Sequence, residues 1–443
     1  MEAGASAGSR CREAKPRRKA STPSSRAAVS TAWSVEGVCV IARSYGGHPP
    51  RGCPIYIGHA CRKVPNSTVP ATFSQQFEHL AAHPPDRVRA FLRLLEPASP
   101  TRLERMAAES ARITRAQFGR TMRLFAPLYL SNECINTCSY CGFSRDNPIL
   151  RITLELDQVE REARHLASQG FRSLLLVAGE HPKFVSNGYL EACIQRLLAV
   201  VPSLAIEVAP METAEYRPLV AAGAEGLVVY QETYDRETYA RLHVAGPKRD
   251  FDWRLDTPER GHAAGFRRIG IGALFGLHHW RQEAFALALH LDHLLKTCWR
   301  SQLTVSMPRL RPAAGGFAPT HPLPDREFVQ LLCALRIAFP SVGIVLSTRE
   351  PAALRDLLLP LGVTLMSAGS HTEPGGYTGQ TGDGLHLTVR GRRVEPEALG
   401  TADQAAEQFA IADPRSPAEI AAALRDRGLD PVWKDWEPSL LTA

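Results

Sequence analysis

Eight short apolar segments, rich in β-branched residues, alternate with helical stretches between residues 126 and 370, and this alternation restricts the possible folds most. Continuous apolar strands separated by helices indicate a parallel sheet covered on both faces. Eight such units match a (βα)8 barrel, which uses about 250 residues. We therefore predict an α/β protein with a TIM-type (βα)8 barrel over residues 121–377; a doubly wound sheet is the alternative. The predicted strands are 126–131, 172–177, 204–209, 226–230, 269–274, 303–308, 342–347 and 363–368.

The segments on either side of the predicted barrel differ from it in composition. Residues 72–120 carry apolar residues at helical spacing, which predicts a helical N-terminal extension. Residues 1–71 are rich in Arg, Ser, Ala, Pro and Gly, and a disordered basic leader is expected there. The leader is interpreted as an organellar transit peptide or as an extension from a misassigned start codon; the second is favoured because no clear amphipathic helix is present. Residues 378–443 are predicted to form a loop insertion, one helix and a tail that packs on the barrel.

The positive charge of the chain is concentrated in this leader. The formal net charge is +7, and residues 1–70 hold 11 Lys and Arg against 3 Asp and Glu. The rest of the chain is close to neutral, which argues against a basic groove for nucleic acid. No apolar run reaches the length of about 18 residues that a membrane span needs. A cytoplasmic location is predicted, or an organelle stroma if the leader is a transit peptide.

Three of the ten cysteines lie close together in the sequence. Cys134, Cys138 and Cys141 directly follow the first predicted strand with the spacing C-x3-C-x2-C. Three thiolates can bind three irons of a [4Fe–4S] cubane and leave the fourth iron without a protein ligand. S-adenosylmethionine (SAM) can chelate that open iron through its amino and carboxylate groups. The spacing therefore predicts a cluster that binds and cleaves SAM in a reducing compartment.

Two other interpretations of these cysteines are a structural zinc site and three unrelated buried thiols. Zinc prefers four ligands, often in two spaced pairs. No fourth Cys or His lies close by in the sequence, and the nearest downstream histidine, His165, falls on a predicted helix. Three further cysteines lie among apolar residues of predicted helices and are expected to be small buried side chains: Cys193, Cys298 and Cys333.

The wider sequence resembles a known family. The motifs that carry the likeness are PLYLSNECINTCSYCGF, LLLVAGEH, VYQETYDRETYARLH, DFDWRLDTPERGHAAGF, SMPRLRP, LSTRE, PGGY and PVWKDW. They resemble the 2-iminoacetate synthases, the radical SAM tyrosine lyases of thiamine thiazole biosynthesis, over residues 72–443 apart from 378–403. The resemblance implies cleavage of L-tyrosine at Cα–Cβ to p-cresol and 2-iminoacetate (dehydroglycine), while SAM is cleaved to 5′-deoxyadenosine and methionine. It also implies a complex with thiazole synthase and an external electron donor such as flavodoxin or ferredoxin.

Polar residues at the ends of predicted strands are the candidates for binding the substrate. Arg309 and Arg311 follow the sixth strand in the motif SMPRLRP. An arginine fork matches the tyrosine carboxylate, and barrels display site residues at such strand ends. Ser306 is expected to add a hydroxyl donor. We therefore predict that Arg309, with Arg311 as the second choice, binds the substrate.

A second group of residues is assigned to SAM. Gly179 and Glu180 follow the second strand in an AGE triplet that resembles the family's turn at the SAM amino group. Glu207 lies in the third strand and is expected to face the barrel mouth or to be paired. Arg254 is expected either to neutralise the SAM carboxylate or to pair with a neighbouring aspartate. Tyr140 is expected either to cover the adenine or to pack in the core.

Further polar residues follow the fourth and seventh strands. Glu232 follows the fourth strand and is a candidate site residue. Arg349 and Glu350 follow the seventh strand and are interpreted either as site residues or as a pair that only starts a helix.

Three rival functions remain from the sequence. The tyrosine lyase of hydrogenase maturation carries a second, C-terminal cysteine cluster, whereas no cysteine follows Cys333 here. A tryptophan-processing radical SAM lyase would share the barrel and the SAM site. A non-catalytic iron–sulfur module would not need an open iron, and SAM binding separates it from the enzymes.

Overall fold

The computed structural model describes residues 29–35, 38–44, 71–379, 384–394 and 404–434. The chain divides into two units, Met1–Val69 and Pro70–Ala443. In the first unit, β1 (Val29–Val35) and β2 (Val38–Ser44) pair antiparallel. Each segment contains two Val and one further β-branched residue, Thr31 in β1 and Ile41 in β2, and such residues favour strands. Residues 29–35 and 38–44 therefore differ from the disordered leader that was expected over residues 1–71. Residues 1–28, 36–37 and 45–70 of this predicted leader lie outside the part of the chain that the structure describes.

A closed parallel barrel forms the centre of the second unit. Eight parallel strands pair in sequence order, and the last strand pairs with the first through Leu365 and Arg123, which closes the ring. The predicted (βα)8 barrel is therefore confirmed, and the doubly wound alternative is wrong because its sheet would stay open. The barrel strands are β3 (Thr121–Ser131), β6 (Ser173–Ala178), β7 (Ser203–Glu207), β8 (Gly226–Glu232), β10 (Arg268–Ala273), β11 (Gln302–Ser306), β12 (Gly343–Leu346) and β13 (Leu365–Ser367).

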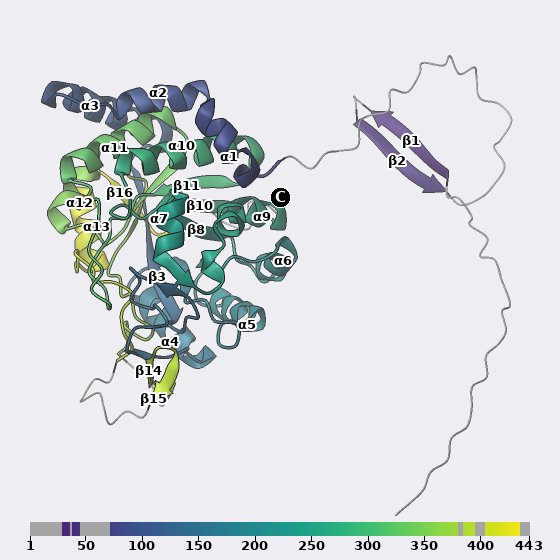
Figure 1. The fold of residues 1–443 in the computed structure, drawn as a ribbon, viewed down its shortest axis with the longest axis vertical. Coiled ribbons are helices and arrows are strands. Elements are labelled where there is room, and N and C mark those ends of the chain that lie inside the picture. The colour runs from purple at the N-terminus through teal and green to yellow at the C-terminus, as the bar shows by residue number, and fades with distance from the viewer. Residues whose placement is uncertain (1–28, 36–37, 45–70, 380–383, 395–403, 435–443) are drawn as a thin grey trace, which may run out of the picture. The chain divides into compact units, whose positions relative to one another are not determined.

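Helices cover the outside of the barrel and bury the outward-facing apolar residues of the strands (Figure 1). None of the described helices is both long and apolar enough to cross a membrane. The covering helices are α4 (Leu156–Ser168), α5 (Asn187–Leu198), α6 (Thr213–Ala221), α7 (Arg236–Leu242), α8 (Phe251–Leu255), α9 (Thr257–Ala264), α10 (Trp280–Thr297), α11 (Asp325–Ala338) and α12 (Ala352–Leu358).

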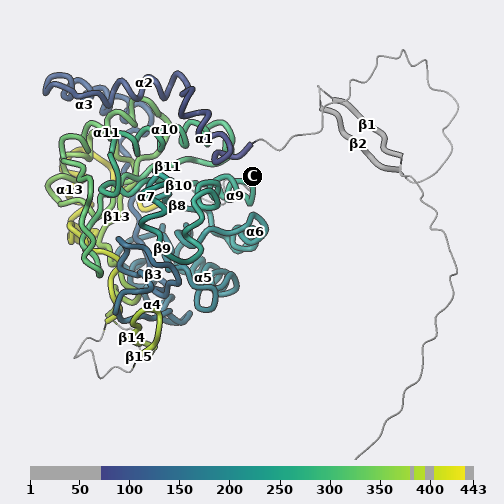
Figure 2. The backbone as a smooth tube through the Cα atoms, in the orientation of Figure 1, coloured from purple at the N-terminus to yellow at the C-terminus, as the bar shows by residue number. Residues whose placement is uncertain are grey.

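Three helices precede the barrel and lie across α10 and α11 (Figure 2). They are α1 (Phe73–Ala82), α2 (Asp86–Leu94) and α3 (Pro100–Phe118). Pro100 occupies the first turn of α3, where its missing N–H costs nothing, and the Ser99 side chain accepts from the Arg102 N–H. Phe73 of α1 is fully buried and stacks on the His290 ring with centroids 4.4 Å apart.

The segment after the barrel returns to it at two places. β16 (Asp430–Val432) runs parallel to the start of β3, and Trp433 packs edge-on against Phe171. β14 (His386–Val389) pairs with β15 (Arg392–Val394) and with β5 (Ile149–Arg151), so this part of the predicted loop insertion is a small sheet. The sequence did not show the pairing with β5, because the two strands lie more than 200 residues apart in the chain.

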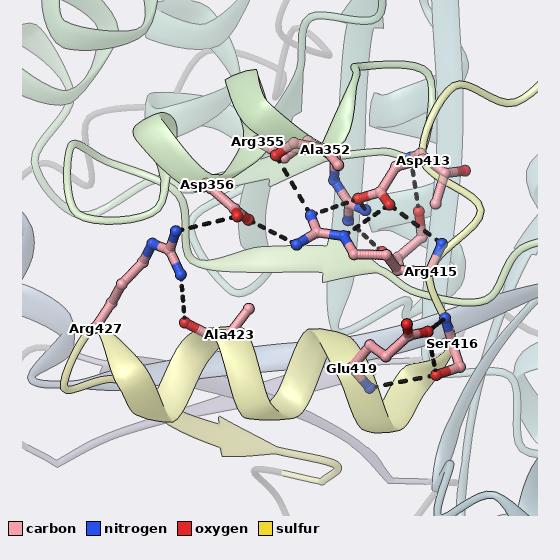
Figure 3. A network of polar contacts seen from close by, with 11 residues as sticks. Ala352, Arg355, Asp356, Asp413, Arg415, Ser416, Glu419, Ala423 and Arg427 are labelled. Atoms are coloured by element: carbon pink, nitrogen blue, oxygen red, sulfur yellow. Dashed lines mark hydrogen bonds and ion pairs between the residues drawn. The ribbon is translucent and has the colours of Figure 1, made fainter.

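An ion network holds α12 to the last part of the chain (Figure 3). Arg355 and Asp413 are both fully buried and form an ion pair, and Arg415 donates to the same carboxylate. Arg415 also reaches Asp356 at 2.9 Å. Directly after this network, Ser416 caps α13 (Pro417–Asp426) with a capping box. The C-terminal helix is thereby fixed against the barrel.

A chain that begins at Pro70 is expected to keep the thermal unfolding midpoint of the full chain, because residues Pro70–Ala443 form one compact unit. A chain that begins at Asp86 lacks α1 and serves as the control. It loses the burial of Phe73 and Phe77, which contribute about 1.5–3 kcal/mol each. Calorimetry of the three chains tests this, and a lower midpoint for the Pro70 chain would contradict it.

Candidate active site

The carboxyl ends of the barrel strands border a cavity. A second cavity adjoins it toward the amino ends of the strands and has a mainly apolar wall. Barrel enzymes place their chemistry at the carboxyl ends, so the first cavity is the candidate active site. Its polar lining residues include Tyr129, Glu207, Tyr230, Ser306, Arg349 and Gln408.

The cysteine loop, defined as residues 132–144, lies against this cavity. It leaves β3 at Ser131, and β4 (Thr137–Cys138) within it pairs with β9 (His243–Ala245). Gln408 connects loop and cavity, because its amide oxygen accepts from the Tyr129 hydroxyl at 2.8 Å and its amide nitrogen lies 3.9 Å from Cys141 Sγ. The three thiols therefore lie beside the polar end of the barrel.

The three thiols are the predicted ligands of a [4Fe–4S] cluster. Cys138 is buried, while Cys134 and Cys141 are partly exposed. Within the described part of the chain, no three His, Cys, Asp or Glu side chains converge on one metal position. In a cubane each thiolate binds a different iron, so its ligands need not converge, whereas zinc requires donors around one ion. Asn136 and Gln408 also direct amide N–H groups at the Cys134 and Cys141 sulfurs, as cluster thiolates require.

Gly179 packs directly beneath the cysteine loop. Its N–H donates to Ser131 O at 3.0 Å, and a Cβ at this position would clash with the Glu133 carbonyl. The sequence assigned Gly179 to the SAM amino group; in the structure its close backbone neighbour is the loop itself. Glu180 also braces the loop, since its carboxylate accepts from Asn136 at 2.7 Å and its carbonyl from Ile135 N at 2.8 Å.

Replacing Gly179 with alanine is expected to displace the cysteine loop, because the added Cβ meets backbone that cannot rotate away. Such overpacking typically costs about 1–3 kcal/mol. Urea unfolding of the apoprotein should begin at a lower concentration, and the iron content after anaerobic reconstitution should fall. Gly188→Ala in α5 is the matched control, since nothing lies within 4 Å of the position that its added Cβ would take. Equal iron content in both variants would contradict the expectation.

A group of buried charges lies between the loop and the cavity. Glu232, at the end of β8, has a positive φ of 71°, which is strained for a residue other than glycine. Its carboxylate accepts from Lys248 Nζ at 2.7 Å and lies 3.7 Å from the Arg254 guanidinium. Burial raises the pKa of Glu232, but Lys248 and Arg254 together lower it by more, so the carboxylate stays ionised. No signal in the sequence marks Lys248, because it follows none of the predicted barrel strands.

Arg254 itself is held by the barrel. Its Nε donates to Tyr230 O at 2.6 Å. The alternative pairing with a neighbouring aspartate is not found, because Asp256 instead accepts from Ser74 of α1. The Arg254 guanidinium therefore lies beside the Glu232 carboxylate.

Glu207 contributes a second carboxylate at the end of β7. It lines the cavity, as the sequence predicted from its charge among apolar residues. Burial and the Glu232 charge raise its pKa to about 7, against the opposing effect of Arg349 and Arg254. A carboxyl group with a pKa near neutrality inside a cavity is typical of functional sites.

Arg309 lies away from the cavity wall, and its predicted contact with the substrate carboxylate stays a prediction. Its guanidinium is bound by Glu350 and by Asp325, the latter at 2.6 Å, and it does not line the cavity. Arg311 does not line the cavity either, and its Nε lies 3.4 Å from Ala410 O. Ser306 does line the cavity, where its hydroxyl accepts from Tyr230 at 3.0 Å.

Arg349 follows the adjacent strand, β12. It lines the cavity, and its guanidinium stacks on the Phe409 ring at 3.3 Å from the centroid. Among the described residues it makes no ion pair, so its fork faces the cavity without a carboxylate partner. The two arginines follow adjacent strands, and the sequence could not tell which one points inward.

Tyr140, within the cysteine loop, does not line the cavity. It is buried, its hydroxyl is 2.9 Å from His243 Nε2, and its ring packs edge-on against Phe317. The ring is close to Lys248, with Nζ 5.7 Å from the centroid. Its predicted contact with the adenine of SAM stays a prediction.

Comparison with known proteins agrees with this site. Residues 128–291 match the Radical SAM superfamily, and residues 306–430 match the Biotin and Thiamin Synthesis associated domain. The chain is 43% identical over 348 residues to 2-iminoacetate synthase of Escherichia coli (strain K12), covering 78% of this chain and 86% of that protein. The chain belongs to the 2-iminoacetate synthase family. The 2-iminoacetate synthase of Salmonella typhimurium is 41% identical with the same coverage. Membership confirms the predicted [4Fe–4S] cluster and SAM as cofactors.

Solved structures place this 2-iminoacetate synthase family member among related barrels. The FeFe-hydrogenase maturase HydG from Carboxydothermus hydrogenoformans is 34% identical, with a TM-score of 0.70 over 82% of this chain and 80% of that one. Methylornithine synthase (PylB) is 22% identical with a TM-score of 0.58, covering 80% of this chain and 97% of that one, and so shares the fold.

Proposed function

We propose that this chain is a radical SAM carbon–carbon lyase that cleaves L-tyrosine to 2-iminoacetate and p-cresol for the thiazole moiety of thiamine. The observation that carries the proposal is 43% identity across 86% of a 2-iminoacetate synthase, combined with a cysteine loop placed beside a polar cavity at the carboxyl ends of the barrel.

Cys134, Cys138 and Cys141 are the proposed ligands of the cluster. When bound, the cluster and SAM supply a 5′-deoxyadenosyl radical that abstracts hydrogen, and the protein orients the substrate and excludes competing reactions. The assignment is supported by the two N–H donors aimed at the sulfurs. The proposed contacts for SAM are the ionised carboxylate of Glu232, the guanidinium of Arg254 and the carboxyl group of Glu207. The backbone at Gly179 and Glu180 is proposed as a further contact.

Arg349 and Ser306 are the proposed contacts for tyrosine. The Arg349 fork suits the substrate carboxylate bidentately, and the Ser306 hydroxyl lies on the wall of the same cavity. Phe409 keeps the guanidinium plane fixed by stacking. Apolar wall residues from β3 and β6 exclude water from the remainder of the cavity. Positioning matters because a misplaced substrate presents the wrong hydrogen to the radical.

The proposed activity is tested with anaerobically reconstituted full-length protein, SAM, a reductant and tyrosine. We expect p-cresol and 5′-deoxyadenosine to form together and in a fixed ratio. Formation of 5′-deoxyadenosine without p-cresol, combined with a cleaved indole product from tryptophan, would assign the chain to the tryptophan-processing lyases. Absence of SAM cleavage in cluster-loaded protein would favour a non-catalytic iron–sulfur module.

A complex with thiazole synthase is proposed for product transfer, because 2-iminoacetate is reactive and hydrolyses in water. A flavodoxin or ferredoxin is proposed as electron donor. Anaerobic size exclusion of the chain with the cognate thiazole synthase is expected to show a joint peak. Separate elution together with failure to cross-link would argue against direct transfer.

A further inference from the structure

Arg151, the last residue of β5, is a buried cation next to the cysteine loop that the proposed chemistry does not use. Its side chain is 1% exposed. One terminal nitrogen donates to Asn132 O at 2.5 Å and to Phe143 O at 3.0 Å, and the other donates to Ser144 O at 2.7 Å. A buried arginine with nearly all its donors satisfied is stable in one orientation.

The three carbonyl groups belong to residues at the two ends of the cysteine loop. Asn132 lies two residues before Cys134, and Phe143 and Ser144 lie two and three residues after Cys141. One guanidinium therefore ties the beginning of the loop to its end. The planar fork of arginine can reach both ends at once, which a lysine ammonium on a single flexible stem cannot reproduce.

The loop start is joined to β5 by further bonds. The Asn132 side chain accepts from Ile152 N at 2.8 Å and donates to Leu150 O at 2.9 Å. Within the loop, Cys138 N donates to Ser144 Oγ at 3.1 Å and Cys141 N to Cys138 O at 3.3 Å. Fixing the two ends consequently fixes the positions from which the three thiols project.

The β14–β15 hairpin orients Arg151 from the other side. Thr388 of β14 accepts from Arg151 Nε at 2.6 Å, and β14 pairs with β5 through Arg151 and His386. His386 also lies 2.8 Å from the carboxylate of Glu133, in the loop itself. The segment that was predicted as an insertion thus contacts the loop directly through His386 and Glu133, and indirectly through the bond between Thr388 and Arg151.

We propose that Arg151 is the positioning residue of the cysteine loop: it closes the loop by binding both ends, and the β14–β15 hairpin holds it in place through Thr388. Arg151 acts through the loop and not on the substrate. The inference depends on the loop holding the cluster and is independent of which amino acid the enzyme cleaves.

The test compares Arg151→Lys and Thr388→Val with Arg336→Lys as matched control. Arg336 is also fully buried and binds three backbone carbonyls, at Pro340, Val342 and Gly362, which lie outside the cysteine loop. Hydrogen exchange of residues 132–144 is measured in the apoprotein. The electron paramagnetic resonance spectrum of the reduced cluster is then recorded with and without SAM in the reconstituted protein.

Arg151→Lys is expected to speed exchange across residues 132–144 by about tenfold or more, because charge-assisted bonds are lost, and to alter the cluster spectrum. Thr388→Val is expected to cause a smaller change in the same direction. Arg336→Lys should lower the unfolding midpoint without changing loop exchange. Unchanged loop exchange in Arg151→Lys, or an equal increase in Arg336→Lys, would overturn the proposal. If Arg151→Lys does not fold, unchanged loop exchange in Thr388→Val overturns it. These readouts need no tyrosine, so failure here is distinct from failure of the lyase assignment.

Discussion

Replacing Cys138 with alanine is expected to abolish the iron–sulfur cluster and, with it, all formation of 5′-deoxyadenosine. Each of the three thiolates is assigned to a different iron, so removing one leaves two irons without a protein ligand. Cys138 is 4% exposed and lies in β4, where it pairs with His243 of β9. The same loss is expected for Cys134→Ala and Cys141→Ala.

The measurement is iron and sulfide per chain after anaerobic reconstitution, followed by 5′-deoxyadenosine formation. The wild-type protein should hold about four irons at this site. Cys193→Ala is the control, because Cys193 is also buried but lies on α5 in the apolar core. It is expected to keep the cluster. SAM cleavage at the wild-type rate in a variant that lacks all three loop cysteines would refute the assignment.

Replacing Arg349 with lysine is expected to uncouple SAM cleavage from tyrosine cleavage. The change keeps the charge but loses the fork that matches a carboxylate. A charge-assisted hydrogen bond contributes about 1.5–3 kcal/mol, so the KM for tyrosine should rise by about ten- to a hundredfold. p-Cresol formation should fall by more than 5′-deoxyadenosine formation, because a misplaced substrate turns the wrong hydrogen toward the radical.

The ratio of p-cresol to 5′-deoxyadenosine, measured anaerobically with tyrosine at saturation, tests this expectation. Arg309→Lys is the matched control from the adjacent strand. Its guanidinium binds Glu350 and Asp325, so the variant is expected to be less stable while its product ratio stays normal. A normal product ratio in Arg349→Lys with an abnormal ratio in Arg309→Lys would assign the tyrosine carboxylate to Arg309 instead.

The barrel was predictable from local sequence because its strands are buried on both faces. Such strands are continuous apolar runs, and all eight predicted segments overlap a strand of the observed barrel. The cysteine loop was predictable for a similar reason, since its three thiols lie within one short segment directly after β3. Because all three cluster ligands lie in one short segment, their spacing can be recognised in the sequence without knowledge of the fold.

What only the tertiary structure decided is which side chains meet across long sequence distances. Arg309 and Arg349 both follow barrel strands, and only the packed structure shows that the first pairs with Glu350 while the second faces the cavity. Lys248 reaches Glu232 from a short 3₁₀ helix, Pro247–Arg249. Arg151 meets Thr388 of β14, which pairs with β5 across more than 200 residues of sequence. The direction of a side chain and the partner of a strand depend on contacts with distant segments, and sequence periodicity reports only the local burial of each segment.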